Sequence, residues 1–170
     1  MPARRETLEL PRPASTLQVE GLTVTPPGQQ TIVVNNVSLK LEKGAGLGVI
    51  GPSASGKSSL ARTLIGAWAP VRGAVRLDGA SLDQWTPDTL GHHIGYLPQS
   101  IELFSGTIAE NIARFDPEAI SEDIIVAARD AGVHDMIVQL PKGYGTEIGE
   151  SGAGLSAGQR QRVALARALY

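Results

Sequence analysis

The sequence of 170 residues contains no cysteine, which excludes disulfide bonds, thiolate zinc sites and cysteine nucleophiles. Its three histidines do not show the spacing of a metal-ligand set. An excess of positive charge is also absent, because 17 acidic residues outnumber 15 basic ones. This balance argues against nucleic acid as a partner that is bound through a basic surface.

Long hydrophobic stretches are absent as well. No apolar run approaches the roughly 18 residues of a membrane-spanning helix, and no signal-peptide pattern follows the N-terminus. We therefore expect the chain itself to be soluble and intracellular, which leaves open a parent protein with a membrane-spanning part. Residues 1–14 are rich in proline and arginine, which predicts a linker or disordered lead-in before a folded part at 15–170.

The pattern beyond the lead-in predicts an α/β fold. Turn signals bound short apolar or alternating segments that indicate strands at 17–24, 32–41, 46–50, 74–78 and 91–97. Helices are predicted at 58–67, from an N-cap at Ser121 onward, and at 159–170. In the helix after Ser121, apolar residues fall on one face at Ile124, Ala127, Ala128 and Ala131. The last helix reaches Tyr170 without a stop signal, which is typical of a domain that is incomplete at its C-terminus.

A complete phosphate-binding pattern, G-x-x-x-x-G-K-S, follows the predicted strand 46–50 and precedes a predicted helix. Its glycines allow backbone amides to turn toward phosphate oxygens, and the helix N-terminus adds partial positive charge. Lys57 supplies a full charge for the β- and γ-phosphates, and Ser58 supplies a hydroxyl for Mg²⁺. The residues of this predicted nucleotide site are Gly51, Pro52, Ser53, Ala54, Ser55, Gly56, Lys57, Ser58 and Ser59.

A second segment, Leu155, Ser156, Ala157, Gly158 and Gln159, precedes the last predicted helix. Ser156 and Gln159 have the spacing of a capping box, and that structural role could be their whole purpose. The same arrangement also offers backbone amides and a hydroxyl to an anion.

Together with Gln99, these two segments resemble the nucleotide-binding domain of ATP-binding-cassette transporters, from about Leu17 to Tyr170. The family signature is Leu-Ser-Gly-Gly-Gln, and Ala157 replaces one of its glycines. The resemblance implies a P-loop core with an antiparallel β-subdomain from 17–41 and 74–78 and a helical subdomain at about 107–140. The segments 103–112 and 146–150 look like exporter segments, although an ordinary amphipathic helix would also explain the first and a solvated loop the second.

The resemblance implies roles for the matching residues. Gln99 would contact Mg²⁺ or the attacking water and sense the transmembrane partner. Residues 155–159 would face the γ-phosphate of ATP on a second copy. Pro26 stands near the position where many members stack an aromatic ring on adenine, which puts base selectivity in doubt. The metal-holding Asp and the water-polarising Glu of the family follow the last helix and have no counterpart here, so the 170 residues alone are expected to lack hydrolysis.

Among exporters, the lead-in and the Pro26 segment are most similar to bacterial type I secretion ATPases. That resemblance implies a transmembrane domain in the same parent chain, a homodimer, a membrane-fusion protein and an outer-membrane channel, at the cytoplasmic face of the inner membrane. A soluble cassette ATPase that is not coupled to transport is the alternative. The acidic composition argues against the forms that act on nucleic acid, and the 155–159 segment argues against a P-loop kinase or switch protein.

Overall fold

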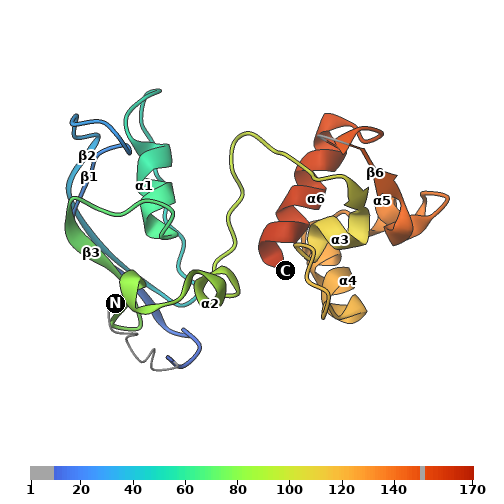
Figure 1. Cartoon of the computed structure of the whole chain (residues 1–170), viewed down its shortest axis with the longest axis horizontal. Coiled ribbons are helices and arrows are strands. Elements are labelled where there is room, and N and C mark those ends of the chain that lie inside the picture. The colour runs from blue at the N-terminus through green and yellow to red at the C-terminus, as the bar shows by residue number, and fades with distance from the viewer. Residues whose placement is uncertain (1–9, 150–151) are drawn as a thin grey trace, which may run out of the picture. The chain divides into compact units, whose positions relative to one another are not determined.

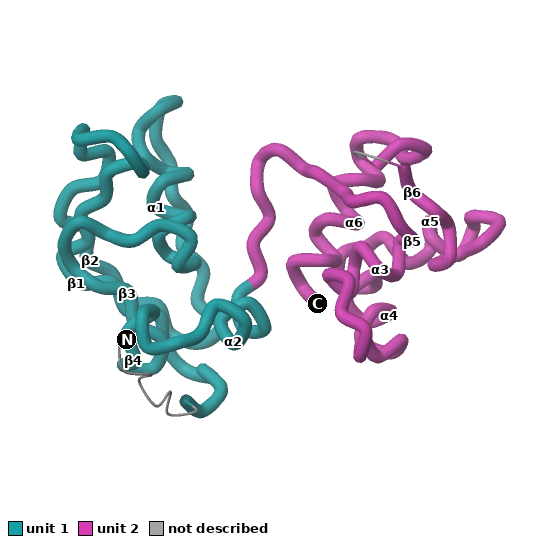
Figure 2. The backbone as a smooth tube through the Cα atoms, viewed as in Figure 1, with its two compact units in different colours: residues 1–94 teal, residues 95–170 magenta. Residues whose placement is uncertain are grey.

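The computed structural model describes residues 10–149 and 152–170. Two compact units make up the chain, residues 1–94 and residues 95–170 (Figure 2). The first nine residues of the predicted lead-in and Glu150 of the predicted exporter loop lie outside the described residues. Residues 10–14 carry no helix or strand.

The first unit is built on an antiparallel sheet with the strand order β2-β1-β3-β4 (Figure 1). The elements of this unit are β1 (Thr16–Val24), β2 (Val34–Glu42), α1 (Lys57–Leu64), β3 (Arg72–Leu77), β4 (Ala80–Ser81), η1 (Leu82–Gln84) and α2 (Pro87–Gly91). Val19 of β1 pairs with Leu39 of β2 on one side and with Val75 of β3 on the other. Leu60 of α1 is buried in the same apolar cluster, so the sheet and the helix share one core. The predicted antiparallel subdomain is confirmed.

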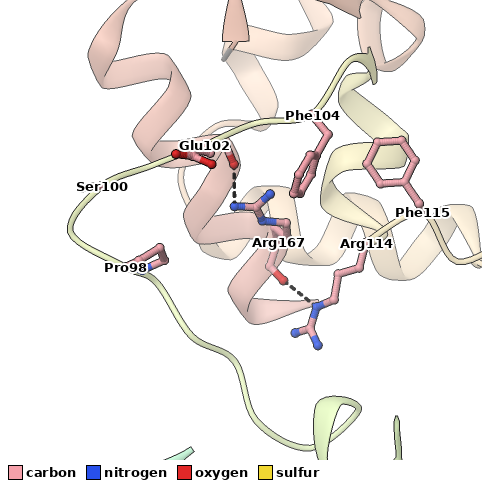
Figure 3. A pocket seen from close by; sticks show the side chains of 7 residues that line it. All are labelled: Pro98, Ser100, Glu102, Phe104, Arg114, Phe115 and Arg167. Atoms are coloured by element: carbon pink, nitrogen blue, oxygen red, sulfur yellow. Dashed lines mark hydrogen bonds between the residues drawn. The ribbon is translucent and has the colours of Figure 1, made fainter. Parts of the chain in front are cut away.

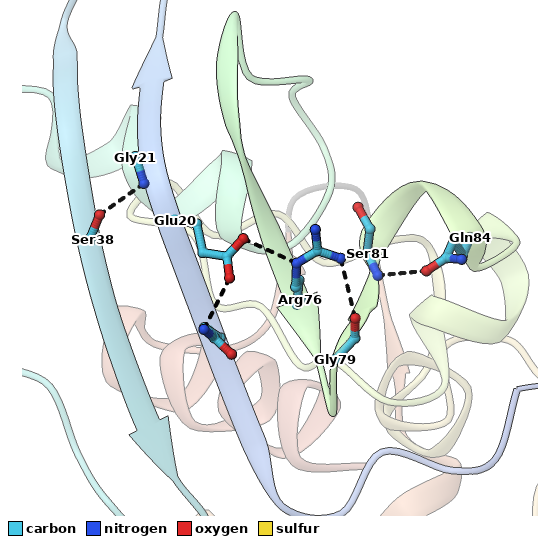
Figure 4. A network of polar contacts seen from close by, with 8 residues as sticks. Glu20, Gly21, Ser38, Arg76, Gly79, Ser81 and Gln84 are labelled. Atoms are coloured by element: carbon cyan, nitrogen blue, oxygen red, sulfur yellow. Dashed lines mark hydrogen bonds and ion pairs between the residues drawn. The ribbon is translucent and has the colours of Figure 1, made fainter.

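Polar groups on the exposed side of this sheet bond across the strands (Figure 4). Arg76 Nε donates to Glu20 Oε2 at 3.2 Å, and Arg76 also donates to the Gly79 carbonyl at 3.3 Å. The Gly21 amide donates to Ser38 Oγ at 2.8 Å and so joins β1 to β2. Exposed pairs of this kind contribute little individually, so the buried face of the sheet carries most of its stability.

The carboxylate of Asp78, in the turn between β3 and β4, binds the end of the lead-in. Its oxygens accept hydrogen bonds from the amides of Ala14 and Thr16, both at 2.6 Å, and from the Ser15 amide at 3.1 Å. These bonds stabilise the charged form and hold the pKa of Asp78 below its usual value, mainly through Ala14 and then Thr16. One exposed side chain therefore fixes where the chain enters the sheet.

Acidification is expected to release this contact. A carboxylate whose folded pKa is depressed stabilises the folded contact above its unfolded pKa of about 3.9, and the contact is lost as the pH falls through the lower folded value. The amide proton shifts of Ala14 and Thr16, followed by NMR against pH, should move together with a midpoint below about 3.9. Asp78→Asn should abolish that titration, and Asp83→Asn, a change at an exposed carboxylate nearby, should leave it in place. A midpoint at or above the unfolded value would contradict the assignment.

Two predicted strands are wrong. Residues 46–50 and 91–97 belong to neither sheet of the described residues, although both segments read as short apolar strands. A strand exists only when a neighbour completes its hydrogen-bond ladder, and no described segment pairs with 46–50. Its side chains are accordingly exposed, and Ile50 is 96% accessible. Of the second segment, Gly91 is the last residue of α2, whose N-cap Thr86 accepts from the Thr89 amide, and residues 92–97 form a turn and irregular backbone.

Most elements of the second unit are helices. Its elements are β5 (Gly106–Thr107), α3 (Ile108–Ile112), α4 (Ser121–Asp130), α5 (His134–Val138), η2 (Gly143–Gly145), β6 (Glu147–Ile148) and α6 (Ala157–Leu169). Their apolar faces form one core, and the face predicted for α4 is confirmed, since Ile124, Ala127, Ala128 and Ala131 are all buried. Ser121 is not the N-cap of α4. Ile120 holds that position, and Ser121 is the first residue inside the helix.

Thr107 and Glu110 close the N-terminus of α3 in a reciprocal capping box. The Glu110 carboxylate accepts from the Thr107 amide and hydroxyl, and these bonds lower the pKa of Glu110. None of the helices in residues 10–149 and 152–170 combines the length and the hydrophobicity that spanning a bilayer requires.

Candidate nucleotide-binding site

The predicted phosphate loop is an irregular segment that leads into α1. The Ser55 amide donates to the Pro52 carbonyl at 3.3 Å and closes a turn inside the loop. Gly56 is the N-cap of α1 with a left-handed backbone at φ 87°, and it has no side chain that could cap the helix. The first amides of α1 are therefore left for an external acceptor, and the helix dipole favours an anion there.

The ammonium group of Lys57 lies within the curve of this loop. Its Nζ donates to the carbonyl oxygens of Gly51 at 2.8 Å and Pro52 at 2.6 Å, and to Ser55 Oγ at 3.2 Å. Three contacts hold a full positive charge beside the first turn of α1. The arrangement suits a polyphosphate, because a cation lies beside the N-terminal end of a helix that no side chain caps.

Backbone strain marks the same loop. Ala54 has a left-handed backbone with φ 64°, which costs a residue with a side chain about 1–2 kcal/mol. Strained positions of this kind persist where the surrounding structure fixes them, and they are common in ligand sites. Ser53, Ala54 and Ser55 are exposed, so the strained part of the loop is open to solvent.

The two predicted magnesium ligands lie in different units. Ser58 is exposed on the first turn of α1, directly after Lys57, where its hydroxyl offers a hard oxygen ligand. Gln99 is exposed in a bend of the second unit. Ser59 follows Ser58 on α1 and is half-buried. Oxygen donors of both kinds fit Mg²⁺, which is held by few protein groups and completes its shell with phosphates and water.

Pro26 lies in the loop between β1 and β2. The Gln29 amide donates to the Pro26 carbonyl at 3.0 Å, which makes this segment a tight turn. The proline ring is half-buried and offers an apolar surface without an aromatic face.

The predicted signature segment opens α6 as the sequence indicated. Ser156 is the N-cap, its hydroxyl accepts from the Gln159 amide at 3.3 Å, and Gln159 Oε1 accepts from the Ser156 amide at 2.8 Å. Leu155 is buried in the helical core, whereas Ser156, Ala157 and Gly158 are exposed. The exposed side of this helix end therefore carries a hydroxyl and the unbonded amides of a helix N-terminus.

Removal of the cap should destabilise α6. Ser156→Ala deletes the acceptor for the Gln159 amide, which is expected to cost about 0.5–2 kcal/mol of unfolding free energy. The three tyrosines, Tyr96, Tyr144 and Tyr170, all lie in the second unit. Urea unfolding followed by the tyrosine ring signals in NMR spectra therefore reports this unit.

Ser121→Ala is the matched control for this change, because Ser121 lies inside a helix and is not its N-cap. The control is expected to change the unfolding free energy by no more than about 0.5 kcal/mol. An equal loss in both variants would show that the Ser156 cap contributes nothing of its own.

Sequence reasoning missed three residues that shape this unit. Arg160 donates to the Leu155 carbonyl at 2.8 Å and braces the signature segment from within α6. Asn111 is fully buried, and Arg167 donates to the Glu102 carbonyl at 3.0 Å. The repeated arginines of the last helix could have drawn attention to Arg160 and Arg167. Both side chains bond to backbone carbonyls, however, and no sequence motif identifies such acceptors.

The family model described as ABC transporter matches residues 34–170. The chain belongs to the ABC transporter family. Over all of its 170 residues, this ABC transporter chain is 59% identical to the type I secretion system ATP-binding protein PrsD of Rhizobium meliloti (strain 1021). It is 46% identical over 137 residues, 81% of the chain, to the leukotoxin translocation ATP-binding protein LktB of Mannheimia glucosida.

A solved structure of a bacterial Atm1-family ABC exporter with ATP bound matches 98% of the chain with a TM-score of 0.84 and 32% identity. The chain spans 29% of PrsD, 19% of LktB and 29% of that exporter chain. The predicted family and fold class are confirmed.

Proposed function

We propose that this chain supplies the nucleotide-binding part of an ABC exporter whose whole protein hydrolyses ATP to drive type I secretion of a protein substrate. The observation that carries the proposal is the 59% identity to PrsD, a type I secretion system ATP-binding protein, over the full chain. The charged loop around Lys57 supports the nucleotide part of the proposal, because it offers a cation and free amides to a polyphosphate.

In this proposal, residues 51–59 hold the phosphates of ATP. Ser58 and Gln99 would each offer an oxygen ligand to Mg²⁺, which when bound would supply positive charge against the phosphates. Gln99 also orients the attacking water. The exposed amides and hydroxyl at 156–158 face the γ-phosphate of ATP bound to a second copy, so that two copies enclose two nucleotides.

The partners follow from the same proposal. A transmembrane domain belongs to the same protein, which works as a homodimer at the cytoplasmic face of the bacterial inner membrane. A membrane-fusion protein and an outer-membrane channel complete the path across the envelope. Pro26 contacts the adenine side without stacking on it, so the phosphates dominate nucleotide affinity.

The test uses the full-length protein that contains this chain. Secreted proteins are compared between cells that carry the intact gene, a deletion and a Lys57→Ala allele, and ATP turnover is measured on purified proteins with Mg²⁺. We expect one or a few proteins to disappear from the medium in both mutants, together with loss of turnover. The 170 residues alone are expected to show no steady-state turnover. ATP turnover by the intact protein with an unchanged set of secreted proteins would instead favour an ATPase that is not coupled to export.

A further inference from the structure

The segment that contains Gln99 is anchored on both sides to the helical unit. Before Gln99, the backbone at Gly95 approaches the last turn of α6 so closely that a Cβ there would overlap the Ala168 carbonyl. Leu97 and Ile101 pack against the helical core on either side of the bend. Gln99 itself is exposed between these anchors.

Arg167 in the last turn of α6 provides the anchor after Gln99. Its guanidinium donates to the Glu102 carbonyl at 3.0 Å, and its Cζ lies 5.8 Å from the centre of the Phe104 ring (Figure 3). The backbone of Arg167 is held in turn, because Arg114 Nε donates to its carbonyl at 3.0 Å. These groups line a pocket of about 330 Å³ that also includes Phe115.

The backbone of Phe104, whose ring lies near the Arg167 guanidinium, is held by hydrogen bonds with Asn111. The buried Asn111 side chain accepts from the Phe104 amide and donates to the Phe104 carbonyl, both at 2.9 Å. It also donates to the Thr107 carbonyl at 3.0 Å. The Asn111 side chain thus holds the backbone on both sides of the Phe104 ring, and the Arg167 guanidinium lies at a cation–π distance from that ring.

The other end of α6 carries the signature segment. The helix begins at the Ser156 cap and is continuous to Leu169. At about 1.5 Å per residue, the cap and Arg167 are about 17 Å apart along one helix. Arg167 therefore joins the far end of this helix to the Glu102 carbonyl, beside the close approach of Gly95 to Ala168 in the same last turn.

We propose that Arg167 is a positioning residue that ties the Gln99 loop to the signature helix, so that the two nucleotide contacts of this unit move as one body. The inference rests on the proposed function, because Gln99 is assigned there to the metal and the water. Arginine suits the task, since its guanidinium donates a hydrogen bond and keeps a positive charge near the face of an aromatic ring at the same time. Burial lowers the pKa of Arg167 and the nearby positive charge of Arg114 lowers it further, but an arginine keeps its charge.

The test compares Arg167→Met with Arg129→Met in the full-length protein. Methionine keeps an unbranched stem and removes the charge and the donors, and Arg129 is an exposed arginine on α4 of the same unit. For Arg167→Met we expect kcat for ATP hydrolysis to fall about ten- to a hundredfold, because a displacement of about 1 Å misplaces Gln99. The KM for ATP should stay within about twofold, because the phosphate loop belongs to the other unit. Arg129→Met should leave both constants unchanged.

Amide hydrogen exchange of the same proteins separates positioning from general destabilisation. In Arg167→Met, the amides of residues 100–104 should exchange faster while those of α3 and α4 keep their protection. Unchanged kcat, or a loss of protection spread equally over α3 and α4, would overturn the proposal. If even the unmodified full-length protein does not hydrolyse ATP, the proposed function fails, and the exchange at 100–104 still decides whether Arg167 fixes the Gln99 loop.

Discussion

Lys57→Ala is expected to weaken ATP binding about ten- to a hundredfold. The substitution removes the charge that three contacts hold inside the loop, with Gly51 and Pro52 carbonyls at 2.8 and 2.6 Å. A charge-assisted hydrogen bond contributes about 1.5–3 kcal/mol, and about 1.4 kcal/mol corresponds to a factor of ten. Isothermal titration of the 170-residue chain with ATP and Mg²⁺ measures the change.

Lys43→Ala is the matched control for this prediction. Lys43 is an exposed lysine in the turn after β2, so its removal changes the net charge equally and leaves the loop intact. Its ATP affinity should stay within about twofold of the unmodified chain. If Lys57→Ala binds ATP as tightly as the unmodified chain, the assignment of this loop as a phosphate site is wrong. Equal weakening in both variants would indicate a nonspecific effect of net charge.

Features that depend on neighbours in the sequence could be predicted here. The capping box of Ser156 and Gln159 requires only residues three positions apart, and it is present. The buried face of α4 follows from helical spacing in the same way. The phosphate loop was also recognisable, because its glycines and Lys57 act through backbone geometry within eight residues.

Features that depend on residues far away in the sequence could not be predicted. The strand predicted at 46–50 needed a neighbouring strand, and no described segment provides one. Arg167 meets the Glu102 carbonyl across 65 positions of sequence, and a backbone acceptor leaves no trace in residue type. The same holds for the carboxylate of Asp78, which binds amides 62 to 64 positions away. The site motifs were therefore predictable, and the contacts that hold their surroundings were not.

Gly56→Ala is expected to destabilise the first unit more than any other glycine-to-alanine change in the phosphate loop. The position has a left-handed backbone at φ 87°, and an added Cβ would overlap the carbonyl oxygen of Val33, the residue just before β2. The backbone strain costs about 1–2 kcal/mol. Forced packing against a neighbour adds about 1–3 kcal/mol. We therefore expect a total loss of about 2–5 kcal/mol in unfolding free energy.

Gly44→Ala separates the cost of backbone strain from the cost of forced packing. Gly44 has nearly the same backbone, at φ 81°, but no atom lies within 4 Å of an added Cβ. This variant should lose only the strain part, about 1–2 kcal/mol. Both tryptophans, Trp68 and Trp85, lie in the first unit, so urea unfolding followed by tryptophan fluorescence reports the unit that carries both glycines. If the two variants lose equal stability, the close approach of Val33 to the phosphate loop does not constrain Gly56. If Gly56→Ala loses more, that approach is what requires a glycine immediately before Lys57.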